Sequence, residues 1–134
     1  MVSEVLCDPR YKSCIDDWVN YILNDAKYTP NGLIYIDRWG TLRHASNVAH
    51  VCAQLTRVGL WESECDSFVK RQIHYALGDT GRSFVVGFGS DPPCRPHHAS
   101  SSCPDLPEPC DWDDFSKSDC NSQANNFLRL VDWS

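Results

Sequence analysis

Apolar residues recur at helical spacing in the segment SCIDDWVNYILNDA, which begins at Ser13. Ser13 and Asp16 stand in the relation of a capping box, which marks a helix start. The apolar face of this segment consists of Ile15, Trp18, Val19 and Ile22. We therefore predict a first helix that begins at Ser13 and ends before YTPNGL, where Pro30 and Gly32 favour a tight turn.

The two stretches that follow predict a pair of helices. TLRHASNVAHVCAQLTRVG has Thr41 in the N-cap position and Gly59 at the left-handed position that ends a helix. SECDSFVKRQIHYALG begins with Ser63 as its cap and stops at Gly78. The predicted buried faces are Leu42, Ala45, Val48, Ala49, Cys52 and Leu55 in the first stretch, and Cys65, Phe68, Val69, Ile73 and Ala76 in the second. Because a short connection joins the helices, they must run antiparallel as an αα-hairpin.

The pattern changes after Gly81. SFVVGFG is a short β-branched and aromatic run closed by glycines, and the stretch 87–104, GFGSDPPCRPHHASSSCP, contains too many prolines and serines for a regular element. The tail has no clear period before Phe127, where a short terminal helix is the only expectation. Three helices with one apolar face each do not enclose a core by themselves, so these faces need partners.

Composition narrows the class of protein. A chain of 134 residues is in the range of a single domain, and its net charge of −6, without a basic stripe, argues against a nucleic-acid or anionic-membrane partner. No apolar run approaches the ~20 residues of a membrane span, and MVSEVLCDPR does not have the pattern of a signal peptide. The 8 cysteines nevertheless indicate an oxidising compartment. Cys52 and Cys65 could equally be small buried hydrophobes within their helices, which would leave fewer than four disulfides.

The proline-rich loop has two chemical interpretations. Its potential zinc ligands are Cys94, His97, His98, Cys103 and Cys110. Their spacing disfavours zinc, since the loop contains no Cys-x-x-Cys pair and adjacent histidines tend to point apart. Cys103 and Cys110 enclose only PDLPEP, a stiff loop that can bring two β-carbons within disulfide range. We therefore predict this disulfide and no metal or other cofactor.

The segments YTPNGLIYIDRWGTLRHASNVAHVC and YALGDTGRSFVVGFGSDPPCRPHHASSSCPDLPEPCDWDDF resemble glycoside hydrolase family nine, the inverting endo-β-1,4-glucanases, and most of all its animal members. The residues that match the family's active-site histidine signature are Ser83, Val85, Val86, Gly89, Pro96 and His97. Two positions depart from it: Asp91 stands where a basic residue or Asn is expected, and Ala99 where Arg is expected.

The resemblance implies an all-α fold that is part of an (α/α)6 toroid, with residues 1–115 a fragment of the catalytic domain and 116–134 a divergent tail. It also implies that His97 lines the substrate cleft and that Trp39 is a platform for a glucose ring. A pyranose offers an apolar face to an aromatic plane and hydroxyls to imidazole nitrogens, so the two side chains suit these roles. The implied partner is a β-1,4-glucan or cello-oligosaccharide, and the implied location is extracellular.

Inverting hydrolysis needs two carboxyl groups about 6.5–9.5 Å apart. The resemblance assigns them to a paired-aspartate motif early in the domain and to a glutamate well after the histidine signature, and neither segment occurs in this chain. DWDD, with Asp111, Asp113 and Asp114, is read as a solvated loop rather than as a substitute. We therefore predict a fragment of an endoglucanase domain that is inactive alone. The alternative is a non-catalytic carbohydrate- or partner-binding fragment.

Overall fold

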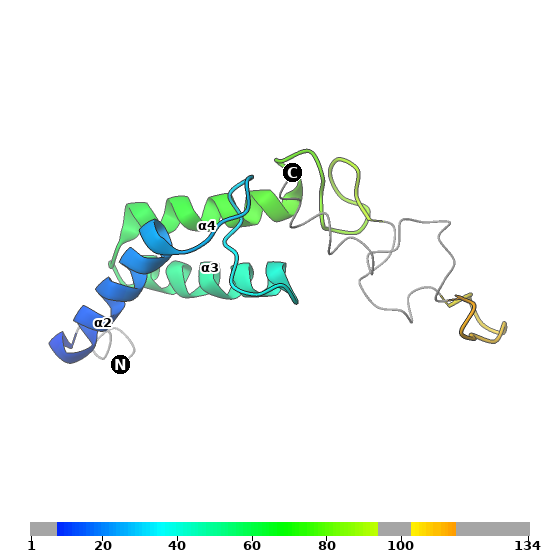
Figure 1. The fold of residues 1–134 in the computed structure, drawn as a ribbon, viewed down its shortest axis with the longest axis horizontal. Helices are drawn as coiled ribbons and strands as arrows, with labels where there is room; N and C mark the ends of the chain where they lie inside the picture. The colour runs from blue at the N-terminus through cyan, green and yellow to red at the C-terminus, as the bar shows by residue number, and fades with distance from the viewer. Residues whose placement is uncertain (1–7, 94–102, 115–134) are drawn as a thin grey trace. The chain divides into compact units, whose positions relative to one another are not determined.

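The computed structural model describes residues 8–93 and 103–114, and the chain divides into two units, Met1–Ile73 and His74–Ser134. The regular elements of the described residues are all helical (Figure 1): α2 (Pro9–Asn20), the π-helical turn η1 (Tyr21–Asp25), α3 (Thr41–Arg57) and α4 (Glu62–Leu77). The tail 116–134, with the terminal helix expected near Phe127, lies outside the described residues. Among the helices that are described, none has the length and apolar character to cross a membrane.

Helix α2 begins about one turn before the predicted start at Ser13, which was wrong. Asp8 is the N-cap, and its Oδ1 accepts a hydrogen bond of 2.9 Å from the backbone N–H of Arg10. Pro9 occupies the first turn, where its missing N–H costs nothing and its fixed φ favours the helix. The Asp-Pro pair was therefore the stronger start signal. The helix continues into η1, which ends with a bond of 2.8 Å from the Ala26 N–H to the Tyr21 carbonyl.

The ends of α3 and α4 were predicted better than their starts. Gly59 has a φ of 77° and closes α3 as predicted, with the Leu60 N–H bonded to the Leu55 carbonyl at 3.0 Å. The predicted N-cap at Thr41 was wrong, because left-handed Gly40 is the N-cap and Thr41 is the first helical residue. The predicted cap at Ser63 was also wrong, since α4 already begins at Glu62.

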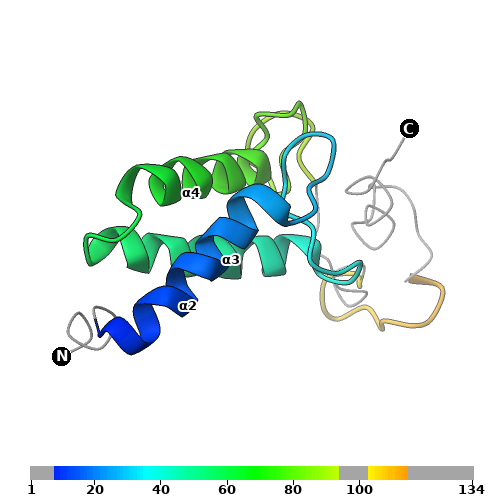
Figure 2. The same ribbon diagram turned by 60° about the vertical axis from the view of Figure 1, so that its left-hand side comes forward.

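Helices α3 and α4 lie side by side and run antiparallel, which confirms the predicted hairpin (Figure 2). The buried residues of the two helices are Thr41, Ala45, Ala49, Cys52 and Leu55 in α3 and Cys65, Phe68, Gln72 and Tyr75 in α4. The expected face of α4 was partly wrong: Ile73 is 41% exposed, and its neighbour Gln72 is only 2% exposed. The true buried face is therefore rotated from the one that apolar character alone selects.

Gln72 is buried because its amide binds the segment that precedes α3. Its Nε2 donates to the Gly32 carbonyl at 3.1 Å, and its Oε1 accepts from the Ile34 N–H at 2.9 Å. Ile34 and Leu33 are completely buried, and the only local β-type pairing is an isolated antiparallel bridge between Tyr28 and Ile34. The side chain of Gln72 thus satisfies backbone groups that a sheet would otherwise pair.

We expect Gln72→Leu to lower the free energy of unfolding by about 2–4 kcal/mol, because it leaves the part-buried Gly32 carbonyl and the buried Ile34 N–H without partners. Gln54→Leu is the matched control, since Gln54 is an exposed helical glutamine of α3. Its expected effect is within about 0.5 kcal/mol. Urea unfolding followed by far-ultraviolet circular dichroism measures both, and equal midpoints for the two variants would contradict the role of Gln72.

Candidate functional site

Trp39 lies on the corner between the segment bound by Gln72 and helix α3. Its side chain is 65% exposed, and its backbone N–H donates to Oδ1 of Asp37 at 3.2 Å. Asp37 also uses its carbonyl to accept a hydrogen bond of 3.1 Å from the Thr41 hydroxyl. Gly40 follows with a φ of 68°, and a Cβ at that position would lie 3.2 Å from the guanidinium of Arg43. The corner is therefore held from both sides while it presents an indole that can stack on an apolar sugar face.

The loop 83–93 carries the first half of the histidine signature. The buried Ser83 donates its N–H to the Ser90 carbonyl at 2.8 Å, and the Gly87 N–H reaches the Pro93 carbonyl at 3.3 Å. The Ser83 hydroxyl accepts the Val85 N–H at 3.1 Å. The loop is thus closed on itself by single bonds rather than by a strand ladder.

The same loop is attached to the last turn of α4. The Phe84 N–H donates to the Ala76 carbonyl at 2.9 Å, and the Phe84 ring stacks on Tyr75 with ring centroids 5.8 Å apart. Gly89 passes so close to the helix that a Cβ there would lie 2.7 Å from the Leu77 carbonyl oxygen. The contact between the loop and the helix therefore requires glycine at this signature position, because even a Cβ does not fit there.

The departure from the signature at Asp91 has a structural counterpart. Oδ2 of Asp91 accepts from Nη1 of Arg82 at 2.6 Å, which joins the two ends of the loop. Asp91 has a left-handed φ of 42°, a conformation that Asp and Asn tolerate better than most residues. The Arg82 side chain is only 12% exposed, so its charge has an acidic partner where it is largely removed from water.

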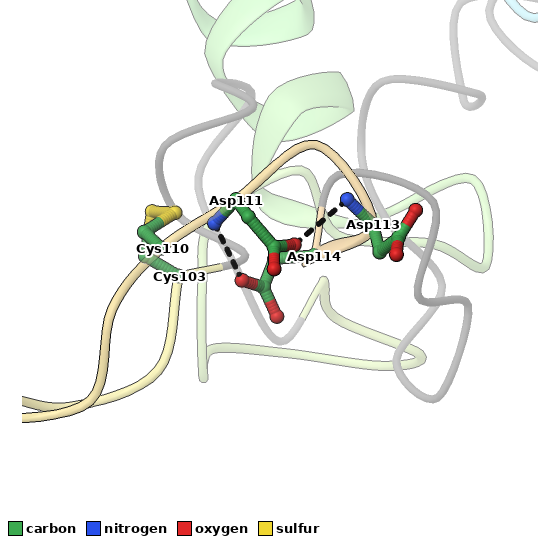
Figure 3. The surroundings of a disulfide bond; sticks show 5 residues. All are labelled: Cys103, Cys110, Asp111, Asp113 and Asp114. Carbon is green, nitrogen blue, oxygen red and sulfur yellow. Dashed lines mark hydrogen bonds between the residues drawn. A yellow bond between two sulfur atoms is a disulfide. The ribbon is translucent and has the colours of Figure 1, made fainter.

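Cys103 and Cys110 are joined by a disulfide, with their Cα atoms 5.1 Å apart (Figure 3). The aspartates that follow form a turn: Oδ2 of Asp114 accepts the Asp111 N–H at 2.9 Å, and Oδ1 of Asp111 accepts the Asp113 N–H at 2.9 Å. The prediction that DWDD is wholly solvated was wrong for Asp114, which is 3% exposed. Its carboxylate is buried because it caps the turn, as Asp side chains commonly do.

The predicted site residues lie in different parts of the chain, and the structure does not describe all of them. Trp39 belongs to the first unit, the loop 83–93 belongs to the second, and His97 lies outside the described residues together with Pro96 and Ala99. Because Cys103 and Cys110 are joined in a disulfide, their sulfurs do not serve as zinc ligands. Over the two described ranges, no cluster of His, Cys, Asp or Glu side chains has an arrangement that could hold a metal ion.

A separate open hollow of about 650 Å³ lies beside Trp61 in the first unit, and Trp39 does not line it. Nε1 of Trp61 donates to Oδ1 of Asp16 at 2.8 Å. Hydrogen bonds from Lys12 and then from Trp61 hold the pKa of Asp16 below its ordinary value. Lys12, Asp16 and Trp61 are therefore engaged with one another in this hollow, and the sequence contained no motif that marked them.

The family model for Glycosyl hydrolase family 9 matches residues 6–128. This match extends past Phe115, the last residue of the resemblance found in the sequence. A solved endoglucanase from the termite Nasutitermes takasagoensis is 50% identical, with a TM-score of 0.80, over 90% of this chain and 28% of that one. An endoglucanase of Dictyostelium discoideum is 36% identical over 90% of this chain and 15% of its own length. The CelQ endoglucanase of Clostridium thermocellum, solved with cellobiose and cellotriose, is 31% identical with a TM-score of 0.63, over 76% of this chain and 18% of that one.

This chain spans about 15% of the length of the first curated relatives that it matches. The helical elements and the termite likeness together confirm the predicted all-α class, in which the described helices are part of an (α/α)6 toroid.

The contact between Gly89 and Leu77 can be tested with two alanine substitutions. Gly87 and Gly89 have similar left-handed φ values of 69° and 77°, but a Cβ on Gly87 meets nothing within 4 Å. We expect Gly87→Ala to cost only the roughly 1–2 kcal/mol of backbone strain. Gly89→Ala must also push the loop off α4. Amide hydrogen exchange at Phe84, whose N–H binds the Ala76 carbonyl, should therefore become at least about tenfold faster in Gly89→Ala than in Gly87→Ala. Equal exchange rates would show that the loop does not depend on this contact.

Proposed function

This chain belongs to glycosyl hydrolase family 9, and we propose on that premise that it is part of an endo-β-1,4-glucanase that hydrolyses cellulose and related glucans with inversion. The observation that carries the proposal is the likeness to the termite endoglucanase, at 50% identity and a TM-score of 0.80 over 90% of the chain. The substrate class follows from relatives that were solved with cellobiose, cellotriose or cellotetraose. The whole enzyme would contribute to the breakdown of plant-type polysaccharide.

We assign Trp39 the role of a sugar platform. Its exposed indole stands on a corner whose backbone is held at Asp37 and Gly40, so little backbone freedom is lost when a ring stacks on it. We assign His97 the role of a hydrogen-bonding residue beside the scissile bond; in the sequence it follows the loop that Phe84 and Gly89 hold against α4. Sugar hydroxyls and imidazole nitrogens both donate and accept, which suits this role.

We further propose that this chain alone does not cleave glucan. Hydrolysis with inversion needs an acid and a base on opposite sides of the bond, each contributing typically 10²–10⁴-fold. Asp114 is committed to the N–H of Asp111, and Asp113 neighbours it in the same tight turn, so the two do not form such a pair. The chain by itself would then act as a non-catalytic carbohydrate- or partner-binding fragment, which is the alternative function.

The proposed location is outside the cell. A disulfide between Cys103 and Cys110 suits an oxidising compartment, where such bonds persist. A polymeric substrate such as cellulose also has to be met where it is laid down or digested.

The platform role predicts that Trp39→Ala weakens binding of cellotetraose by roughly tenfold, about the free energy of one aromatic stacking contact. Trp112→Ala is the matched control, because Trp112 is also a largely exposed tryptophan, in the second unit. Isothermal titration calorimetry or chemical-shift titration of the purified chain measures both. Equal loss in the two variants would assign the binding to generic indole contacts rather than to the corner.

The catalytic proposal predicts no release of reducing ends from soluble cellulose derivatives by the purified chain. A reducing-sugar assay checks this, with the chain at concentrations that saturate cellotetraose binding. The proposal fails if reducing ends appear at a rate that Asp113→Asn or Asp114→Asn abolishes, since DWDD would then hold a working carboxyl group.

A further inference from the structure

Cys52 and Cys65 are brought together at the centre of the helical hairpin. Cys52 is on α3 and Cys65 is on α4, and both residues are completely buried. Neither is in a disulfide, and each thiol interacts with the other strongly enough to shift its pKa. The two buried thiols are therefore neighbours at the interface between the antiparallel helices.

The surroundings of this pair suit a structural role better than a reactive one. Burial, more than any other cause, raises the pKa of both thiols, so the reactive thiolate is scarce in the folded hairpin at neutral pH. Within the described residues no third His, Cys, Asp or Glu joins them in a metal-binding group. Exposed Cys14 is the contrasting case, a thiol that reagents can reach directly.

We propose that Cys52 and Cys65 form a disulfide that covalently links α3 to α4 when the chain folds in the presence of an oxidised low-molecular-weight disulfide such as glutathione disulfide. The inference does not rest on the proposed sugar chemistry. It follows from two cysteines that the fold places in contact although they lie on separate helices.

The chemistry is a pair of thiol–disulfide exchanges. One cysteine thiolate attacks a sulfur of glutathione disulfide, forms a mixed disulfide and releases one glutathione thiolate. The second cysteine thiolate then attacks the protein sulfur of that mixed disulfide and releases the other glutathione. The two protein thiols lose two electrons and two protons, and one glutathione disulfide is reduced to two glutathione molecules. Because the folded pair is buried and protonated, the exchange proceeds while the hairpin is still forming or transiently open.

The test is oxidative refolding of the full chain followed by peptide mapping. Reduced chain in urea is diluted into a buffer of reduced and oxidised glutathione, quenched with N-ethylmaleimide and digested with trypsin. Cleavage after Arg43, Arg57 and Lys70 yields peptides 44–57 and 58–70, each with a single cysteine, so their linkage is unambiguous in a mass spectrum. The same oxidation in about 8 M urea supplies the baseline for random pairing.

The linked pair of peptides should exceed the urea baseline by at least about fivefold, because the folded hairpin holds the two sulfurs in contact. Cys14→Ser is the control variant and should leave the yield unchanged, whereas in Cys65→Ser the Cys52 peptide should carry the maleimide. Recovery of both wild-type peptides as maleimide adducts, or a yield equal to the baseline, would overturn the proposal. So would alkylation of Cys52 and Cys65 as fast as that of Cys14 in the reduced chain, since the pair would then not be buried.

The same digest, with additional cleavage at Asp105, reports on the disulfide in the second unit. We expect Cys103 and Cys110 to be recovered as a linked pair, as their short proline-containing loop favours. Free thiols at both positions under oxidising conditions would show that the second unit does not contain this disulfide.

Discussion

The buried amide of Gln72 is the contact on which the first unit depends. The segment that precedes α3 has almost no ladder of its own, yet Leu33 and Ile34 are fully buried, and buried peptide groups must find partners. One glutamine side chain supplies both a donor and an acceptor at the required places, which few other residue types can do. A long-range hydrogen bond therefore takes the place of a strand pair.

The position of Trp39 follows from this contact. The chain leaves the Gln72-bound segment and turns at Asp37 and Gly40, and it begins α3 directly afterwards. The backbone that carries the exposed indole is consequently held by elements on either side of it. The loop 83–93 is held in a different way, by ring stacking and by a backbone approach that only glycine permits. Both candidate regions thus owe their order to α4, one through a side chain and one through the carbonyls of the last turn.

The sequence was sufficient to predict the hairpin, because the glycines that end α3 and α4 have one physical explanation, a left-handed residue after the last turn. Helix starts were harder, since Gly40 has no side chain that marks it as the cap of α3, and the Asp8–Pro9 pair was overlooked. Gln72 could not be found by apolar periodicity, because a polar residue on a buried face is recognised only when its hydrogen-bond partners are known. Its place in the series Cys65, Phe68, Gln72 and Tyr75 was the available signal.

Motifs in the sequence likewise did not reveal which contacts the candidate site residues make. The family signature identified Ser83 and Gly89, but the motif does not state their contacts: Ser83 bonds Ser90 and Val85 within the loop, and Gly89 approaches helix α4. The ion pair that accompanies the departure at Asp91 was hidden because Arg82 lies outside the signature. Burial of Asp114 was missed since its partner is a backbone N–H rather than a charged side chain. The contact between Cys52 and Cys65 depends on the register of two helices, which periodicity does not determine.

Helix α4 also sets a limit on how this part of the fold can be exchanged between relatives. The division between the two units falls after Ile73, within the helix and one residue beyond Gln72. In an α-helix the carbonyls of one turn are satisfied by the N–H groups of the next, so the final turn supports the turn that carries Gln72. A chimera joined at the division would keep these backbone donors but would exchange the side chains of the last turn, among them the buried Tyr75 on the same face as Gln72. Crossover points in family recombination should therefore avoid α4 and lie at Asp79 or Thr80, after the glycine that ends the helix.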